Sequence, residues 1–262
     1  MIFSFWRTDA PPFDHGFPAA AAAAWRAAGA RFQVFDTADV QAALAPWGAE
    51  AQALFSTLRL PACQADLARL VLMHRHGGLY VDAHAGPGHG PSLARLLAAQ
   101  ADHELLLWDE SPPRPGWRNT CILNGVIGGA RGSDLLALLI GQALDNLRAH
   151  RTAERRAWPG HAAYNVYQLT GPWMIWHALY ERPGAEADAE LQAAFRERVA
   201  VWPFEPDPAR RAVHWSRFTD YKRAGRHWSE RQACEPLFEP DGQAAGDAPA
   251  AVAPNGLHER PD

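Results

Sequence analysis

The amino-acid sequence predicts an α/β fold in which helices cover both faces of a sheet. Short apolar runs typical of buried strands alternate with segments of helical pattern, beginning near the N-terminus. The chain has 262 residues, 48% of them hydrophobic and 21% charged, which is enough for one large core. We therefore predict one domain over residues 1–239. The Ala/Pro/Gly-rich tail at 240–262 has little to bury, and we predict that it is disordered.

In the first part of the chain, strands are predicted where short apolar runs lie between turn residues. Helices are predicted where alanine or other helix-forming residues recur at helical spacing. In chain order, the sequence predicts a strand at 2–6, a helix at 19–28, a strand at 32–35 and a helix that begins with 40–44. A further helix is predicted before Gly77, followed by a strand at 79–81. The glycine-rich stretch 86–90 lacks the Gly-Lys-Ser/Thr ending of a phosphate-binding loop, so we predict a flexible turn there.

The second part of the chain continues the alternation. In chain order, the sequence predicts a helix at 91–99, strands at 104–108 and 122–129, helices at 134–150 and 173–180, and a strand at 199–204. The helix at 134–150 has the clearest pattern, because Leu135, Leu139 and Leu147 recur at helical spacing. The proline-rich run 111–116 is predicted to be a loop.

Composition and charge exclude several classes of protein. The formal net charge of −4 is not that of a protein with the basic face that nucleic acid requires. The three cysteines lie far apart and suit a reducing compartment better than a disulfide framework. The first residues lack a signal-peptide pattern, and no apolar stretch approaches the roughly 20 residues of a membrane span. We predict a cytoplasmic protein with no nucleic-acid partner and no transmembrane segment.

The stretch from Cys63 to Pro87 carries the strongest functional signal. Its predicted strand ends just before Asp82 and His84, which lie two residues apart, so along an extended strand both side chains point to the same side. A carboxylate and an imidazole placed in this way can share a divalent cation. Asp66 and Arg69 lie one turn apart on the preceding helix and are neighbours on its surface. This pattern predicts a site for a metal and a phosphorylated ligand.

These residues resemble the sugar-binding region of the family-32-like glycosyltransferases. That family typically has Ser-Asp, an Arg three residues later, and then Gly-Gly-Ile/Leu-Tyr-x-Asp-x-Asp. The match covers roughly residues 2–228 and is strongest at 65–84. The segments that carry it are Phe3-Ser4-Phe5-Trp6, Ala65-Asp66 with Arg69, Gly77-Gly78-Leu79-Tyr80-Val81-Asp82-Ala83-His84, Asn124 and Thr170-Gly171-Pro172. As a spaced set this match is fairly specific, although each piece alone is weak.

The resemblance implies a GT-A fold, a UDP-sugar or GDP-sugar donor, a saccharide or glycoconjugate acceptor, and Mn²⁺ or Mg²⁺. It implies catalytic roles for Asp66, Arg69 and Asp82. The residues that it places at the nucleotide sugar are Trp6, Asp66, Arg69, Tyr80, Asp82, Asn124, Lys222 and Trp228. Several roles have a structural alternative: core packing for Trp6, a salt bridge on the helix surface for Asp66 with Arg69, and a turn cap beside a surface histidine for Asp82 with His84.

Two departures from the family pattern affect the predicted metal site. His84 stands where the family has its second aspartate, and Ala65 stands where it has serine. Imidazole is an acceptable ligand for Mn²⁺, whereas carboxylate suits the harder Mg²⁺. The basic and aromatic C-terminal segment 210–231 resembles the part of the family that closes the site. The residues that could hold the metal are therefore Asp82, His84, His214 and His227, while Lys222 or Arg226 could contact the diphosphate.

The leading hypothesis is a metal-dependent hexosyltransferase of polysaccharide or glycoconjugate synthesis. The family retains anomeric configuration, and that route requires no dedicated general base. An inverting enzyme would need a carboxylate near the acceptor, with Asp109 and Glu110 as the first candidates. Two rivals are a degenerate member that binds a nucleotide sugar or a partner without catalysis, and a metal-dependent hydrolase. The hydrolase is less well supported, because the histidines show no HExxH-like spacing.

Overall fold

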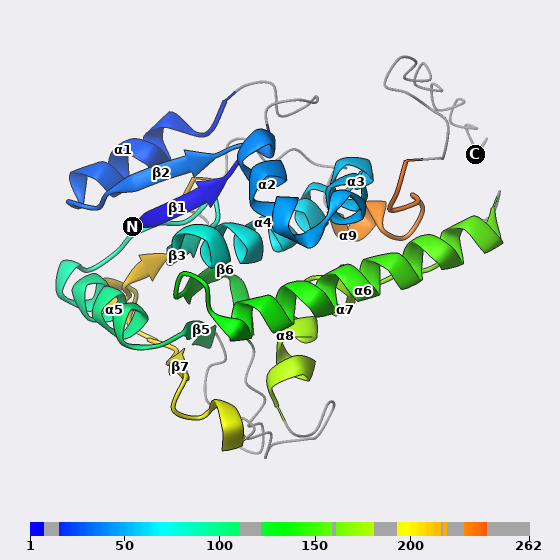
Figure 1. Cartoon of the computed structure of the whole chain (residues 1–262). Coiled ribbons are helices and arrows are strands. Elements are labelled where there is room, and N and C mark those ends of the chain that lie inside the picture. Colours follow the sequence, from blue (N-terminus) through cyan, green and yellow to red (C-terminus); the bar gives the residue numbers. More distant parts are fainter. Residues whose placement is uncertain are drawn as a thin grey trace, which may run out of the picture.

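The structure, a computed structural model, describes residues 1–7, 16–109, 122–158, 161–180, 193–215, 217–218 and 228–239. Its centre is a mixed six-stranded sheet with the order β2-β1-β3-β6-β5-β7 (Figure 1). The strands are β1 (Ile2–Phe5), β2 (Phe32–Phe35), β3 (Gly78–Val81), β5 (Leu105–Asp109), β6 (Ile122–Gly129) and β7 (Val199–Trp202). Only β6 runs antiparallel to its neighbours β3 and β5, while the other pairs are parallel.

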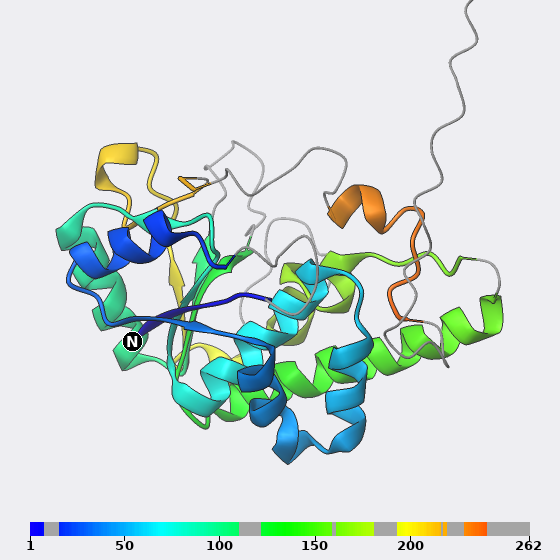
Figure 2. The ribbon, with the colours of Figure 1, turned by 90° about the horizontal axis from the view of Figure 1, so that it is seen from above.

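Helices lie on both sides of this sheet. The α-helices are α1 (Ala19–Ala27), α2 (Thr37–Leu44), α3 (Ala49–Thr57), α4 (Pro61–His76), α5 (Gly90–Asp102), α6 (Asp134–Ala157), α7 (Val166–Leu169), α8 (Pro172–Leu179) and α9 (Trp228–Arg231). Short 3₁₀ turns occupy Ala45–Trp47, Ala193–Phe195 and Pro208–Arg210. Figures 1 and 2 show α1 and α5 on one side, and α2, α3, α4 and α6 on the other. The predicted mixed α/β class with helices on both faces is confirmed.

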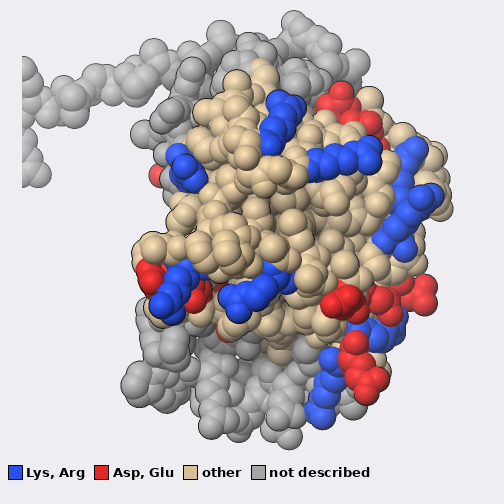
Figure 3. Space-filling model, turned by 90° about the vertical axis from the view of Figure 1, so that its left-hand side faces the viewer, with Lys and Arg blue, Asp and Glu red and all other residues tan. Residues whose placement is uncertain are grey.

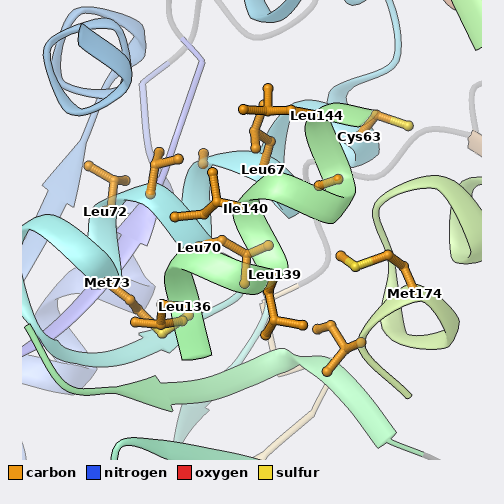
Figure 4. Packing of buried hydrophobic residues seen from close by; sticks show 14 of the residues in the cluster. Cys63, Leu67, Leu70, Leu72, Met73, Leu136, Leu139, Ile140, Leu144 and Met174 are labelled. Atoms are coloured by element: carbon orange, nitrogen blue, oxygen red, sulfur yellow. The ribbon is translucent and has the colours of Figure 1, made fainter. Parts of the chain in front are cut away.

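Two hydrophobic cores result from the alternation of side chains along the strands. On β1, Phe3 and Phe5 join the larger core beneath α4 and α6, whereas Ile2 joins the smaller core beneath α1 and α5. On β3, Tyr80 faces the larger core, and Leu79 faces the smaller one. In the larger core the apolar side chains of α4 and α6 interdigitate, with Met174 of α8 beside them (Figure 4). The sheet is therefore covered on both faces, as its nearly continuous apolar strands predict.

Most predicted elements are present, with shifts of up to three residues at several ends and two larger differences. The helix predicted at 134–150 continues to Ala157, because the polar and basic residues after 150 extend it beyond the apolar stripe. The prediction of a flexible turn at 86–90 is wrong. Residues Gly86–Pro87 form strand β4, which pairs with β8 (Val213–His214), and α5 begins at Gly90. The predicted loop at 111–116 and the tail 240–262 lie outside the described residues.

The surface in the described regions carries charges of both signs. Figure 3 shows the left-hand side of Figure 1, where arginine and acidic side chains lie around a surface that is mostly uncharged between them. None of the helices in the described ranges is both long enough and apolar enough to cross a bilayer.

The C-terminal segment is attached to α6 through one partly buried carboxylate. The backbone N–H groups of Leu237 and Phe238 donate hydrogen bonds to Glu154, and His150 Nε2 lies 3.0 Å from the same carboxylate. Burial acts to raise the pKa of Glu154, but these hydrogen bonds outweigh burial and hold the pKa below its usual value. The ionised carboxylate of Glu154 therefore stabilises the contact between α6 and the C-terminal segment.

We expect Glu154→Gln to lower stability by about 1 kcal/mol at pH 6, because the amide accepts weaker hydrogen bonds than the carboxylate. A depressed carboxyl pKa contributes stability above the unfolded-state pKa, and this contribution is lost as the pH falls through the folded-state pKa. The difference in free energy of unfolding between the unaltered protein and Glu154→Gln should therefore narrow between pH 6 and pH 3. Urea unfolding at several pH values in this range measures the free energy of unfolding of both proteins. If their difference does not change with pH, the ionised Glu154 carboxylate is not the cause of the stabilisation.

Candidate functional site

The candidate site lies at the sheet edge where β1 and β3 end and β6 begins. The chain turns from α4 into β3 at Gly77 and Gly78, whose φ angles of 69° and 115° favour glycine. A Cβ at Gly78 would lie 2.5 Å from the carbonyl oxygen of Met1, so only glycine fits between β1 and this turn. The glycine pair therefore brings Asp66 and Arg69 on α4 close to Asp82, which directly follows β3.

Asp66 is buried at the centre of the site, with 5% of its surface exposed. Its Oδ1 lies 3.0 Å from Arg69 Nη2 and accepts a hydrogen bond of 2.8 Å from Asn124 Nδ2. Its Oδ2 accepts a hydrogen bond of 2.9 Å from the Thr170 hydroxyl. Burial raises the pKa of Asp66, whereas Arg69, Thr170 and Asn124 oppose that rise. All three donors favour the carboxylate.

Arg69 is equally buried and uses its guanidinium to connect four groups of the protein. Nε donates to the carbonyl of Ala65 at 3.1 Å, and Nη1 donates to the carbonyl of Asn124. Nη2 lies 3.0 Å from Asp66 and 3.6 Å from Asp82 Oδ1. Burial acts to lower the pKa of Arg69, but Tyr80 and the two aspartates outweigh it, so the pKa is raised and the group stays charged. In this structure Arg69 holds the two carboxylates in place.

Asp82 is the accessible carboxylate of this network, with 25% of its side chain exposed. Tyr80 donates a hydrogen bond of 2.8 Å to Asp82 Oδ1, and its ring lies under Arg69, with Cζ 4.6 Å from the ring centroid. Burial raises the pKa of Tyr80 well above its usual value, so the phenol remains a donor. The Asp82 backbone N–H donates to the carbonyl of Gly125 at 2.8 Å. Side chain and backbone are therefore both held, while Oδ2 is not among the atoms in these hydrogen bonds.

His84 lies beside Asp82, but not for the reason that the sequence suggested. β3 ends at Val81, and residues 82–85 form a turn in which Ala85 N–H donates to the carbonyl of Asp82 at 2.9 Å. This turn, rather than an extended strand, brings His84 Nε2 to 4.0 Å from Asp82 Oδ2. The carbonyl of His84 accepts N–H hydrogen bonds from Arg217 and Phe218 at 2.8 and 3.2 Å. The C-terminal segment thus helps to hold the turn.

Two parts of the site were not identified from the sequence. Gly125 lies so close to Asp82 that a Cβ there would be 2.6 Å from Oδ2 and 2.9 Å from Cζ3 of Trp215. Trp215 also packs edge-on against Trp108, with ring centroids 5.8 Å apart. Its proximity to Asp82 depends on the pairing of β4 with β8. The glycines of the 86–90 stretch make that pairing possible, since a Cβ at Gly88 would lie 2.1 Å from the carbonyl oxygen of Arg211.

The other predicted site residues are distributed as follows. Asn124 joins the network, as described above. Trp6 is 6% exposed and packs edge-to-face against Phe17, which favours the core-packing alternative over base stacking. Trp228 packs against Tyr167 of α7. Asp109 ends β5. The predicted residues Lys222, Arg226, His227 and Glu110 lie outside the described residues.

The predicted metal ligands are only partly brought together. Asp82 and His84 face each other, and His214 on β8 pairs in register with Gly86, two residues after His84. Burial lowers the pKa of His214, and Arg217 and Arg211 act in the same direction. Among the described residues, no group of three His, Cys, Asp or Glu side chains is arranged to hold a metal ion. A third protein ligand from His214 or His227 stays a prediction.

Comparisons with known proteins give weak likenesses. No protein-family profile matches the sequence, and no curated protein matches it. The chain is similar to the solved structure of the PaToxG glycosyltransferase, with 12% identity and a TM-score of 0.32 over 67% of this chain and 55% of that one. It is also similar to the UDP-bound glycosyltransferase domain of the YGT toxin, with 9% identity and a TM-score of 0.30 over 51% of this chain and 38% of that one. The chain therefore spans about half of the first protein and less of the second, and likenesses this weak do not decide its function.

Proposed function

We propose that the protein is a GT-A-type glycosyltransferase that moves a hexose from a UDP-sugar or GDP-sugar to a saccharide or glycoconjugate. The observation that carries this proposal is the arrangement at Asp82. A partly exposed carboxylate faces an imidazole at 4.0 Å, and a buried network of Asp66, Arg69 and Tyr80 holds it. A surface aspartate that only caps a turn would need no such support. The setting that we propose is polysaccharide or glycoconjugate synthesis.

The donor groups at this edge fit Mn²⁺ or Mg²⁺. Oδ2 of Asp82 and Nε2 of His84 lie 4.0 Å apart, so these two residues would hold such a cation. Sites of this kind commonly use only one or two protein ligands and complete the shell with substrate phosphates and water. When bound, the cation would neutralise charge on the diphosphate leaving group. Imidazole in place of the second carboxylate favours Mn²⁺ over Mg²⁺.

Within this proposal the buried and exposed residues have different roles. Asp82 and His84 are the groups that meet the donor diphosphate and its cation. Asp66, Arg69 and Tyr80 orient Asp82, and the positive charge of Arg69 offsets part of the negative charge of the two aspartates. Retention of anomeric configuration is part of the proposal, because the sequence resembles a retaining family whose route requires no dedicated general base. Asp109, at the end of β5, is the described candidate for that role if the enzyme inverts.

A second candidate is a protein that binds a nucleotide sugar but does not transfer it. The arrangement of donors favours this reading, because no group of three His, Cys, Asp or Glu side chains among the described residues could hold a metal ion. A site with two protein donors binds a cation less tightly on its own than one with three. Nucleotide binding that does not depend on metal, without turnover, would therefore identify this candidate.

Titration calorimetry with UDP and GDP, in Mn²⁺, in Mg²⁺ and in EDTA, tests the proposal. We expect one nucleotide to bind more tightly in Mn²⁺ than in EDTA, and the corresponding nucleotide sugars to be hydrolysed slowly in the absence of acceptor. Binding that is equal in EDTA, with no hydrolysis, would favour the non-catalytic candidate. No binding of either nucleotide under any of the three conditions would overturn both.

A further inference from the structure

Three aromatic residues form an exposed surface on α7, α8 and α9, which we call the aromatic shelf: Tyr167, Trp173 and Trp228. Tyr167 and Trp173 are 42% and 51% exposed. Their rings lie nearly parallel, with an interplanar angle of 29° and centroids 6.3 Å apart. Trp228 is partly buried against the larger core and meets Tyr167 edge-on at 5.0 Å and 73°. The shelf is therefore a surface of two similarly oriented rings supported by a third.

The shelf adjoins the candidate site through the residues that connect α7 to α8. Thr170 donates its hydrogen bond to Asp66 from this connection. A Cβ on the next residue, Gly171, would lie 3.4 Å from Asp66 Oδ2 and 2.9 Å from Cα of Tyr167. Gly171 therefore lies between the backbone of Tyr167, which carries the first ring of the shelf, and the buried side chain of Asp66. The shelf is thus connected through the backbone of residues 167–171 to the network that holds Asp82.

The chemistry of the α7 and α8 part of this surface favours an uncharged, polar partner. Residues 166–180 contain no Asp, Glu, Lys or Arg, although α7 and α8 reach the surface. The other exposed side chains of this stretch are Gln168 and His177, which can donate and accept hydrogen bonds. Large exposed aromatic groups next to a functional site are typical of binding surfaces. A phosphate group or nucleic acid would find no cation in residues 166–180, whereas α9, which carries Trp228, also carries Glu230 and Arg231.

We propose that the aromatic shelf binds a pyranose ring of a neutral acceptor saccharide by stacking on Trp173 and Tyr167. One face of a pyranose presents C–H bonds with partial positive charge, which the negative face of an aromatic ring attracts. The hydroxyl groups at its edge can bond to neighbouring polar side chains. The proposal rests on the proposed transferase function, because only a transferase needs an acceptor beside the donor site. It also assigns Trp228 to the support of the acceptor surface rather than to the nucleotide.

Saturation-transfer NMR with the methyl glycosides of glucose, galactose, mannose and N-acetylglucosamine tests this proposal on the full chain. We expect saturation to pass to ring C–H protons of at least one glycoside, and this transfer to be lost in Trp173→Ala. The matched control is Trp158→Ala, which removes a tryptophan that is 62% exposed at the end of α6, and should keep the transfer. Thermal unfolding of both variants verifies that each is folded.

The outcomes separate this proposal from the one on which it rests. No transfer to any glycoside, or equal transfer in both variants, would overturn the aromatic shelf as a saccharide site. Self-association in sedimentation experiments that Trp173→Ala removes would also overturn it, since a second copy of the chain would then cover the rings. UDP and GDP calorimetry on the unaltered protein tests the donor site separately. Nucleotide binding without saccharide binding would overturn only the proposal that the shelf binds a saccharide. Saccharide binding without nucleotide binding would overturn the proposed transferase function.

Discussion

Replacement of Arg69 by methionine is expected to lower the free energy of unfolding by about 3–5 kcal/mol, the range for breaking a buried ion pair from one side. Methionine keeps an unbranched chain but removes every hydrogen-bond donor of the guanidinium. The carboxylate of Asp66, of which 7% of the side chain is exposed, would lose its cation while remaining in the core. Asn124 and Thr170 still donate to it, but neither carries charge. The main cost is either the uncompensated charge or the free energy of protonating Asp66, whose pKa burial already raises.

Urea unfolding followed by circular dichroism measures this loss, with Arg148→Met as the matched control. Arg148 forms ion pairs with Asp145 and Glu50 at 2.7 and 3.1 Å, but the carboxylate side chains are 70% and 68% exposed. Surface pairs of this kind contribute about 1 kcal/mol or less. If Arg69→Met costs no more than Arg148→Met, the buried pair does not stabilise the fold, and its role as the support of Asp82 loses its physical basis.

Local patterns predicted the elements of the fold because each carries its own signal. The α4–β3 turn is an example: two consecutive glycines after a helical run indicate its end, and both adopt positive φ. The strands β2 and β6 begin and end at the predicted residues, since turn residues bound their apolar runs. The identities of Asp66, Arg69, Asp82 and Asn124 were also predicted, and the structure brings these residues into one network.

Contacts between distant segments were not predictable, because they depend on how complete elements pack. The Thr170 hydroxyl reaches Asp66 across 104 residues, and no periodicity marks that partnership. The pairing of β4 with β8 involves strands too short to produce an alternating pattern. Gly86 and Gly88 therefore suggested flexibility, whereas they permit close approach of another segment. The same limit applies to Gly125, whose importance arises from its proximity to Asp82 rather than from its own conformation.

Replacement of Asp82 by asparagine is expected to reduce donor hydrolysis about 100-fold or more, which is the effect of removing one electrostatic contact at a reacting centre. Asparagine keeps the size of the side chain and can still accept the hydrogen bond from Tyr80. It removes the charge that the proposed cation and diphosphate site requires. Hydrolysis of the nucleotide sugar in Mn²⁺ measures the loss. Thermal unfolding should change little, because the Asp82 backbone N–H still donates to Gly125. Full activity in Asp82→Asn would show that the proposed role of Asp82 is wrong.

Gly125→Ala provides an independent test, because it leaves the carboxylate present but moves it. The new Cβ would meet Asp82 Oδ2 at 2.6 Å and Trp215 at 2.9 Å, so the carboxylate must turn away from His84 or the indole must shift. We expect hydrolysis to fall in this variant too, while calorimetry shows weaker nucleotide binding in Mn²⁺ and unchanged binding in EDTA. Gly141→Ala is the matched control: nothing lies within 4 Å of its Cβ, and alanine favours the helix interior by about 1 kcal/mol. If Gly125→Ala behaves like Gly141→Ala, the position of the Asp82 carboxylate does not matter. The proposed pairing of Asp82 with His84 at one cation would then be wrong.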